Sequence, residues 1–294
     1  MIRKRIFAAL AAATLVTAGV VTAAAVTGES AAVRPTAAAV PAFDHIVLVM
    51  FENKKYSSIN GSSSAPYFTT LASQSAKFTN SFAITHPSQP NYVALFSGAT
   101  QGVTDDSCPA NLGAKANLGR QLIDAGKTFK GYSEAMPSDG YTGCSSGTYR
   151  RKHNSWVDFS NVPAASNVRF SGFPSDFTQL PTVSFVTPDM CNDMHDCSIG
   201  TGDTWLSKEV PKILASKAYK EGGALFVTFD ESAGSDVPIG FIALSPLAKP
   251  GYSSSVTYTH SSTLRSVQEI FGVTPLLGDA ANATNLSDLF KSFP

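Results

Sequence analysis

The sequence comprises 294 residues, of which 22 are lysine or arginine and 22 are aspartate or glutamate, so the formal net charge at pH 7 is zero. With 43% hydrophobic and 15% charged residues, it lacks the low hydrophobicity and high net charge of disordered chains. It also lacks the excess of Lys and Arg that a broad nucleic-acid-binding surface requires, so no nucleic-acid partner is predicted.

The N-terminal residues have the pattern of an export signal. Arg3, Lys4 and Arg5 precede an uncharged run at residues 6–26 that is rich in alanine, valine and threonine. An uncleaved membrane anchor is the alternative, but alanine and threonine make this run only weakly apolar. We therefore expect a signal peptide at residues 1–26, a flexible lead-in at residues 27–42 and one folded domain at residues 43–294. The mature protein is expected to be secreted, with no stable membrane anchor.

Apolar runs of strand length alternate with helical patterns from residue 45 onward. The runs span residues 45–51, 183–186, 224–229 and 239–244, with a weaker run at 128–132. Continuous apolar runs are typical of strands buried on both faces. Helices are predicted at residues 92–96, 117–125, 204–215 and 261–271. This alternation predicts a single α/β domain with a doubly wound, mostly parallel sheet and helices on both faces.

Acidic residues follow three of the apolar runs, in the pairs Glu52-Asn53, Pro188-Asp189 and Asp230-Glu231. In a parallel sheet the carboxyl ends of the strands share one edge, where ligands bind. Any one acidic residue there could simply start a turn or cap a helix, but crowded carboxylates repel one another unless a cation lies among them. We therefore predict a divalent metal ion, of undetermined identity, held by Glu52, Asn53, Asp230 and Glu231.

Ser88 lies just ahead of Pro90, a residue that the first turn of a helix tolerates. From spacing alone its hydroxyl would be an ordinary helix cap. The functional alternative is a nucleophile at the positive end of the helix, where a phosphate group binds well. The Gly-x-Ser-x-Gly motif of many Ser-His-Asp hydrolases is absent. Among five histidines, His195 and His260 are the favoured functional candidates because they lie in segments that follow predicted strands.

Four cysteines in an exported chain permit two disulfides. A bridge between Cys191 and Cys197 would close a short loop, which leaves Cys108 and Cys144 as the second pair. The sequence leaves other pairings open. A zinc site is the alternative, but the Cys-x-x-Cys spacing does not occur.

Several segments, taken together and in order, resemble a known family of enzymes. It is the bacterial phosphoesterase family of secreted acid phosphatases and phospholipases C, within the alkaline-phosphatase-like superfamily. The matching segments lie in residues 45–53, 86–92, 97–98, 152–154, 188–196, 201–206, 228–231 and 260–265. The resemblance therefore extends over nearly the whole of the predicted domain.

The resemblance implies roles for individual residues. Ser88 would be the nucleophile that forms a phosphoseryl intermediate and would also approach the metal, with Glu52, Asn53, Asp230 and Glu231 as metal ligands. Asn91 and His153 would bind the phosphate, and His195 or His260 would donate a proton to the leaving group. A single metal is favoured; a second one, the alternative, would be held by Asp189, Asp193 and His260.

The resulting prediction is a secreted, metal-dependent phosphomonoesterase of the acid phosphatase type, acting on small phosphate esters. A phospholipase C type phosphodiesterase that acts on phospholipid head groups is the alternative within the enzyme class. Outside that class, a catalytically silent protein that binds phosphate or another ligand remains an alternative. The basic run Arg150-Arg151-Lys152 could meet an anionic substrate or form a solvated surface, and the solvated surface is the default.

Overall fold

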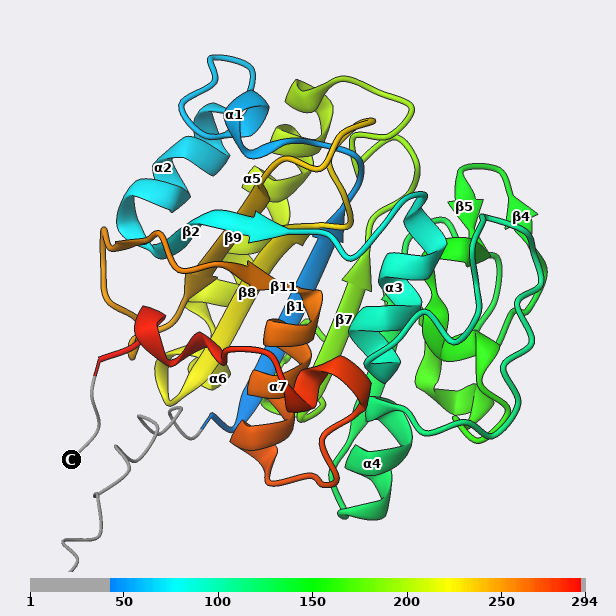
Figure 1. Cartoon of the computed structure of the whole chain (residues 1–294). Coiled ribbons are helices and arrows are strands. Elements are labelled where there is room, and N and C mark those ends of the chain that lie inside the picture. Colours follow the sequence, from blue (N-terminus) through cyan, green and yellow to red (C-terminus); the bar gives the residue numbers. More distant parts are fainter. Residues whose placement is uncertain (1–42, 292–294) are drawn as a thin grey trace, which may run out of the picture. The chain divides into compact units, whose positions relative to one another are not determined.

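The computed structural model describes residues 43–291, which are built around a central sheet (Figure 1). The predicted signal peptide and lead-in lie outside the described residues. The strands of this sheet follow one another in the order β10-β2-β9-β8-β1-β7-β3-β6, and β11 also pairs with β2. Their bounds are β1 (His45–Phe51), β2 (Ala76–Phe82), β3 (Phe129–Ser133), β6 (Asn167–Arg169), β7 (Val183–Thr187), β8 (Gly223–Phe229), β9 (Ile239–Leu244), β10 (Ser253–Ser254) and β11 (Tyr258–Thr259). A separate hairpin is formed by β4 (Ser145–Ser146) and β5 (Tyr149–Arg150).

The predicted mostly parallel sheet is confirmed. Strands β8, β1, β7, β3 and β6 are all parallel to one another along the sheet. Strand β9, by contrast, runs against its neighbours β8 and β2. The run at residues 239–244 is thus a strand as predicted, but an antiparallel one. All five predicted apolar runs are strands of this sheet.

Helices cover both faces of the sheet, as predicted (Figure 1). Helices α3, α4 and α7 pack in the core on one face, and α2 and α5 pack in the core on the other. The helix bounds are α1 (Tyr56–Ile59), α2 (Pro66–Gln74), α3 (Ser88–Ser97), α4 (Leu118–Asp124), α5 (Ile199–Ala215), α6 (Lys217–Lys220) and α7 (His260–Phe271).

Strand β1 shows why a central strand needs a continuous apolar run. Its side chains at residues 46, 48 and 50 belong to the core with α3, α4 and α7. Those at residues 47, 49 and 51 belong to the core with α2 and α5. Because successive side chains of a strand point to opposite faces, every position of β1 from Ile46 to Phe51 lies in one of the two cores, which favours an apolar residue at each.

The sequence pattern did not reveal β2 or α2. Strand β2 has no continuous apolar run: Lys77, Thr79, Asn80 and Ser81 are polar, and several of its positions are only partly buried. Helix α2 begins at Pro66, which occupies its first turn. Its N-terminal amides are bound by Asp203 of α5, at 3.0 Å from Tyr67 N and 2.7 Å from Phe68 N. A cap supplied from a distant helix cannot be recognised from local sequence.

Both proposed disulfides are present. Cys108 pairs with Cys144 and Cys191 with Cys197, at Cα separations of 5.8 and 4.7 Å. The cysteines therefore do not form the alternative zinc site. Within residues 43–291, no helix is both long enough and apolar enough to span a membrane.

Candidate active site

The predicted convergence of acidic residues at strand ends is found between β1 and β8. These strands are adjacent and in register, with Phe51 opposite Phe229. Glu52 and Asp230 therefore emerge side by side at the carboxyl edge of the sheet. The Asp230 carboxylate accepts a hydrogen bond from the backbone N–H of Asn53 at 2.9 Å. Both acidic side chains are fully buried.

Ser88, the first residue of α3, points at this pair. Its hydroxyl donates to Glu52 Oε2 at 2.9 Å, and only 1% of its surface is exposed. One turn later in α3, the hydroxyl of Tyr92 donates to the other oxygen of Glu52. The two α3 residues therefore hold the Glu52 carboxylate in one orientation. The Ser88 hydroxyl is directed to the site, so it is not the ordinary helix cap that spacing alone suggests.

His153 and Asp193 complete a buried group around Glu52. His153 Nε2 lies 3.3 Å from Glu52 Oε1, and its Nδ1 lies 3.6 Å from Asp193 Oδ2. The imidazole stacks on the Tyr92 ring with a centroid separation of 5.0 Å. Within residues 43–291, Glu52, His153 and Asp193 form a group of ligand-type side chains close enough together to hold one metal ion.

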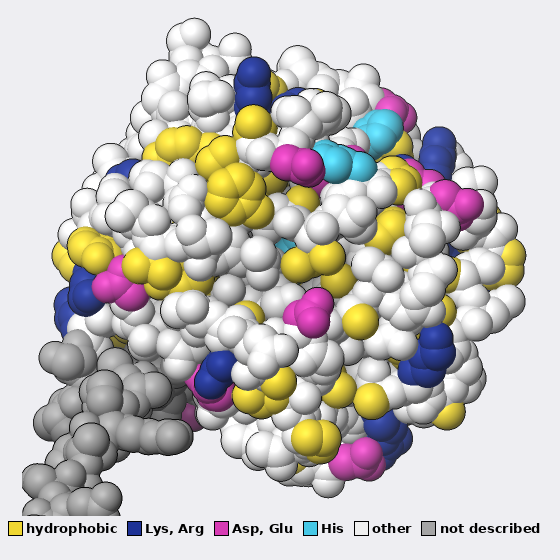
Figure 2. Space-filling model, viewed as in Figure 1, with side chains coloured by type: hydrophobic (Ala, Val, Ile, Leu, Met, Phe, Trp, Pro, Cys, Tyr) yellow, Lys and Arg dark blue, Asp and Glu magenta, His cyan; other side chains and the backbone are white. Residues whose placement is uncertain are grey.

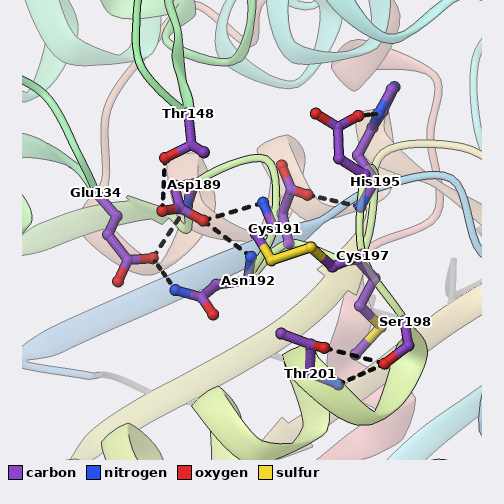
Figure 3. Close-up of a disulfide and its surroundings, with 12 residues drawn as sticks. Glu134, Thr148, Asp189, Cys191, Asn192, His195, Cys197, Ser198 and Thr201 are labelled. Carbon is purple, nitrogen blue, oxygen red and sulfur yellow. Dashed lines mark hydrogen bonds and ion pairs between the residues drawn. A yellow bond between two sulfur atoms is a disulfide. The ribbon is translucent and has the colours of Figure 1, made fainter.

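Asp193 belongs to the loop that follows β7. Hydrogen bonds to Asp189 hold this loop in shape (Figure 3). Asp189 accepts hydrogen bonds from the backbone N–H groups of Cys191 and Asn192 at 3.0 and 2.9 Å, and from the Thr148 hydroxyl at 2.8 Å. The Cys191–Cys197 disulfide closes the same loop. Asp189, the predicted ligand of a second metal, therefore has both carboxylate oxygens hydrogen-bonded in the structure.

Burial and mutual repulsion disfavour charge on the carboxylates when no cation is present. The pKa of Glu52 is raised well above its ordinary value, first by burial and then by Asp230 and Asp193. Burial raises the pKa of Asp193 to about 8, and it also raises the pKa of Asp230. Burial lowers the pKa of His153 well below its ordinary value, so this imidazole is neutral and can act as a ligand.

The residues at this edge fit a divalent metal ion. Among the buried polar atoms that have no hydrogen-bond partner within residues 43–291, four belong to the residues gathered here: Asn53 Oδ1, His153 Nε2, Asp193 Oδ2 and Asp230 Oδ2. Buried polar atoms are normally satisfied, so a set of unsatisfied ones in one place indicates a bound group. Carboxylate and amide oxygens with one imidazole nitrogen are suitable ligands for several divalent cations.

Asn91 does not face the site. Its Oδ1 accepts hydrogen bonds from the N–H groups of Ile84 and Thr85 at 2.9 and 3.1 Å. Its Nδ2 donates to the carbonyls of Thr85 and Pro87 at 2.8 and 3.1 Å. Both amide donors and the amide oxygen are thus engaged by the loop that leads into α3. In the structure, therefore, the Asn91 amide holds this loop in place.

His260 is buried beneath the site. Only 2% of it is exposed, and its Nε2 lies 2.6 Å from the Asp230 carbonyl oxygen. Burial lowers its pKa to about 4, so it is neutral at physiological pH. Its Nε2 is thus engaged by a backbone carbonyl, and the group of metal-ligand side chains found within residues 43–291, Glu52, His153 and Asp193, does not include it. His260 supports the segment that carries Asp230.

Two other histidines lie at the exposed rim of the site. His86 pairs with the Glu231 carboxylate and lies 3.3 Å from Asp236, and 34% of its side chain is exposed. His195 pairs with Asp196 at 2.7 Å, and 30% of its side chain is exposed. Figure 2 shows histidine side chains beside acidic ones on the surface near the carboxyl end of β1. His86 and Tyr92 were not singled out from the sequence, although both lie within four residues of Ser88.

This sheet, with its polar residues gathered at the carboxyl edge, has the architecture of the alkaline phosphatase superfamily. A solved member of that superfamily from Vibrio parahaemolyticus is similar with a TM-score of 0.59 and 12% identity, over 82% of this chain and 69% of that one. The lipoteichoic acid synthase LtaP from Listeria monocytogenes also has a TM-score of 0.59, at 10% identity over 82% and 76% of the two chains. At these identities the similarity establishes the fold alone.

The chain belongs to the Phosphoesterase family, whose model matches residues 62–274. It is 44% identical to a phosphatidylinositol-3-phosphatase of Mycobacterium tuberculosis, over 86% of this chain and 85% of that one. It is 30% identical to a probable acid phosphatase of Kluyveromyces lactis, over 84% and 65% of the two chains. An acid phosphatase of Aspergillus fumigatus is also 30% identical, over 81% and 56%. The protein is therefore a hydrolase of phosphoric esters.

Proposed function

We propose that this hydrolase is a phosphomonoesterase of the acid phosphatase type, with Ser88 as its nucleophile. The observation that carries the proposal is the hydrogen bond from the Ser88 hydroxyl to Glu52, within a buried group of carboxylates at the start of α3. The relatives support a monoesterase, because those compared above are named as phosphatases. A monoester on a soluble molecule and one on a lipid head group present the same phosphoryl chemistry, and both are proposed substrates.

The proposed reaction gives separate roles to Ser88, Glu52 and His195. The Ser88 oxygen bonds to phosphorus as the ester oxygen leaves, and Glu52 Oε2 is positioned to hold the serine proton. His195, at the exposed rim, gives a proton to the departing oxygen. Water then attacks the phosphoserine and gives a proton to His195, while Glu52 returns its proton to the Ser88 oxygen, so phosphate is released and the Ser88 hydroxyl is restored.

The proposed metal site unites residues predicted from sequence with residues that the fold adds. Glu52, Asn53 and Asp230 would hold the ion together with His153 and Asp193. Glu231, also predicted as a ligand, lies next to Asp230 in sequence and pairs with His86 at the rim. When bound, a divalent metal lowers the pKa of a nearby hydroxyl and offsets charge on the phosphoryl oxygens.

Comparing two substrates tests the monoesterase assignment. We expect p-nitrophenyl phosphate to be hydrolysed at least about 100-fold faster than p-nitrophenylphosphorylcholine at equal concentration, because a diester lacks one of the anionic oxygens that the site would bind. Phosphatidylinositol 3-phosphate and a soluble inositol phosphate would then separate lipid-linked from soluble monoesters. Faster hydrolysis of the phosphorylcholine diester would support the phospholipase C type instead.

The role of His195 can be tested by varying the leaving group. His195→Gln should slow hydrolysis of an alkyl phosphate by about 100-fold or more, because the departing alkoxide needs a proton. It should slow p-nitrophenyl phosphate by less than about tenfold, since p-nitrophenolate leaves without one. The measurement is kcat/KM for both esters, with His45→Gln as the control, a histidine that bonds to the Pro181 carbonyl at the start of β1 and so lies at the opposite end of that strand from Glu52. Equal losses with both leaving groups would contradict the assignment of His195 as the acid.

Secretion is also proposed, on the basis of the N-terminal pattern and the two disulfides. We expect protein recovered from the culture medium to lack the first residues up to about position 26. The intact mass and N-terminal sequence of that protein measure the cleavage point. Recovery of the uncleaved chain from the membrane fraction would favour the anchor instead.

A further inference from the structure

The fold places the residues of the basic run Arg150-Arg151-Lys152 in three different environments. Arg150 donates to two carbonyls of its own hairpin, at 2.6 and 2.8 Å. Arg151 is buried and pairs with Asp158 at 3.1 Å. Lys152 directly precedes His153 of the buried group, and its ammonium pairs with Asp106 at 2.7 Å. Only 16% of its side chain is exposed, so Lys152 does not belong to a solvated surface.

The position of Lys152 brings its charge close to the candidate site. It directly precedes His153, whose ring lies 3.3 Å from Glu52, the residue that the Ser88 hydroxyl contacts. Its ammonium is held by Asp106, which also binds the first turn of the helix that begins at Ser88. Lys152 therefore contributes a positive charge near the place where a phosphoryl group would be attacked.

Asp106 links this lysine to the helix that carries Ser88. Its Oδ2 accepts from Lys152, and its Oδ1 accepts from the backbone N–H of Gln89 at 2.9 Å. The residue preceding α3 is Pro87, which provides no side-chain cap. Asp106 thus supplies a carboxylate to the N-terminus of α3 from a distant loop, an arrangement that stabilises a helix start. One carboxylate fixes both the first turn of α3 and the position of the ammonium.

The Lys152 ammonium has further N–H groups that can donate to a substrate. A lysine ammonium has three N–H groups, and within residues 43–291 only Asp106 accepts from this one. The other lysine near the carboxylates, Lys54, donates to the Met194 carbonyl at 2.8 Å. Of the two, Lys152 alone combines an anionic partner with a location next to the start of α3.

We propose that Lys152 is a phosphate-binding residue, which donates to a non-bridging oxygen of the phosphoryl group at Ser88, and that Asp106 is its positioning residue. The inference rests on the proposed function, because it places the phosphoryl group at Ser88. It extends that function by naming a side chain that recognises the charge of a phosphate monoester. The ammonium keeps its bond to Asp106 and uses a second N–H for the phosphoryl oxygen.

Binding of inorganic phosphate, measured by calorimetry on the protein as purified, tests the proposal without turnover. Lys152→Met should weaken binding by about 10- to 100-fold, the effect of losing one charge-assisted hydrogen bond. It should also reduce the salt dependence of binding, because one charge on the site is gone. Lys152→Arg should restore most of the affinity. Lys212→Met removes the same charge from an exposed lysine paired with Glu209 on α5 and should change neither value.

Asp106→Asn provides a second test if Lys152→Met does not fold. Its amide oxygen can still accept from the N–H of Gln89, but the ion pair with Lys152 is lost. We expect KM for p-nitrophenyl phosphate to rise about three- to tenfold with kcat nearly unchanged, because ground-state and transition-state contacts to the phosphoryl group weaken together. A purely structural role for Asp106 would lower thermal stability without this selective rise in KM.

The outcomes distinguish this inference from the proposed function. If Lys152→Met binds phosphate as tightly as the wild-type protein while phosphatase activity is intact, the Lys152 assignment is overturned and the function stands. If the wild-type protein binds phosphate in a Lys152-dependent way but hydrolyses no monoester, the proposed function fails and the binding role stands.

Discussion

Ser88→Ala is expected to reduce kcat/KM for p-nitrophenyl phosphate by at least about 10,000-fold, with the protein still folded. The hydroxyl is the group proposed to attack phosphorus, and removal of a nucleophile eliminates the covalent route altogether. The substitution deletes one oxygen that donates to Glu52, while the bond from Tyr92 to the same carboxylate remains. The measurement is steady-state kinetics, with thermal unfolding as a check on the fold.

Ser97→Ala is the matched control for this variant. Ser97 is a buried serine in the last turn of α3, where its hydroxyl donates to the Val93 carbonyl at 2.8 Å. Removing it should leave kcat/KM within about threefold of the wild-type value, because a bond within the helix backbone affects stability rather than chemistry. Acid-quenched wild-type enzyme should carry phosphate on Ser88, detectable by peptide mass spectrometry. Retention of full activity by Ser88→Ala would exclude this serine as the nucleophile.

Removal of the metal is expected to abolish activity and to lower the unfolding midpoint by about 5–10 °C. A ligand that binds only the folded state at about 100 times its Kd adds about 2.7 kcal/mol of stability, which corresponds to a few degrees per kcal/mol for a domain of this size. Prolonged dialysis against a chelator, followed by calorimetry and an activity assay, measures both effects. Addition of single divalent cations should restore activity and show which ion the site prefers.

The loss of stability on metal removal should grow with pH. In the metal-free protein burial raises the pKa of Asp193 from 3.8 to about 8, so between those values the folded state binds a proton that the unfolded state releases. Stability of the metal-free protein therefore falls as pH rises from about 4 to about 8. The metal-loaded protein should lack this decline, because the cation replaces the proton as the partner of the carboxylate.

Asp193→Asn is the control for the pH effect. The amide is nearly the same size but does not titrate, so the metal-free variant should lose much of the dependence of its midpoint on pH. Its metal affinity should fall as well, since one anionic ligand is missing. If wild-type protein melts at the same temperature with and without chelator throughout this pH range, the proposed metal site is wrong.

The central architecture follows from local sequence because its cause is local. A strand covered on both faces is mostly apolar, so β1, β7, β8 and β9 are recognisable as largely apolar runs, although β7 also buries Ser184 and β8 buries Thr228. Helix α4 is equally clear, because Asn117 caps its start by accepting from the N–H of Arg120. The short spacing of Cys191 and Cys197 likewise identifies a loop that a disulfide closes.

Part of the active site is predictable in the same way. Parallel strands end at one edge of a sheet, so the residues that follow β1 and β8 must lie near each other. The positions of Glu52, Asn53 and Asp230 at this edge follow from their place in the sequence alone. Strand β9 shows the limit of such reasoning, because the apolar run predicts the strand and does not specify its direction.

Only the tertiary structure decided which partner each polar side chain has. Asp193 reaches Glu52 and His153 because a cross-linked loop returns to the sheet edge, whereas Asp189, at the strand end itself, is used to build that loop. Asn91 and His260 carry functional groups suited to phosphate chemistry, but in the structure these groups form hydrogen bonds with backbone atoms. The hydrophobic pattern is a property of neighbouring residues in the chain, so it can be read from local sequence. A hydrogen-bonding partner is any group that the fold brings within about 3 Å, and local sequence does not specify which group that is.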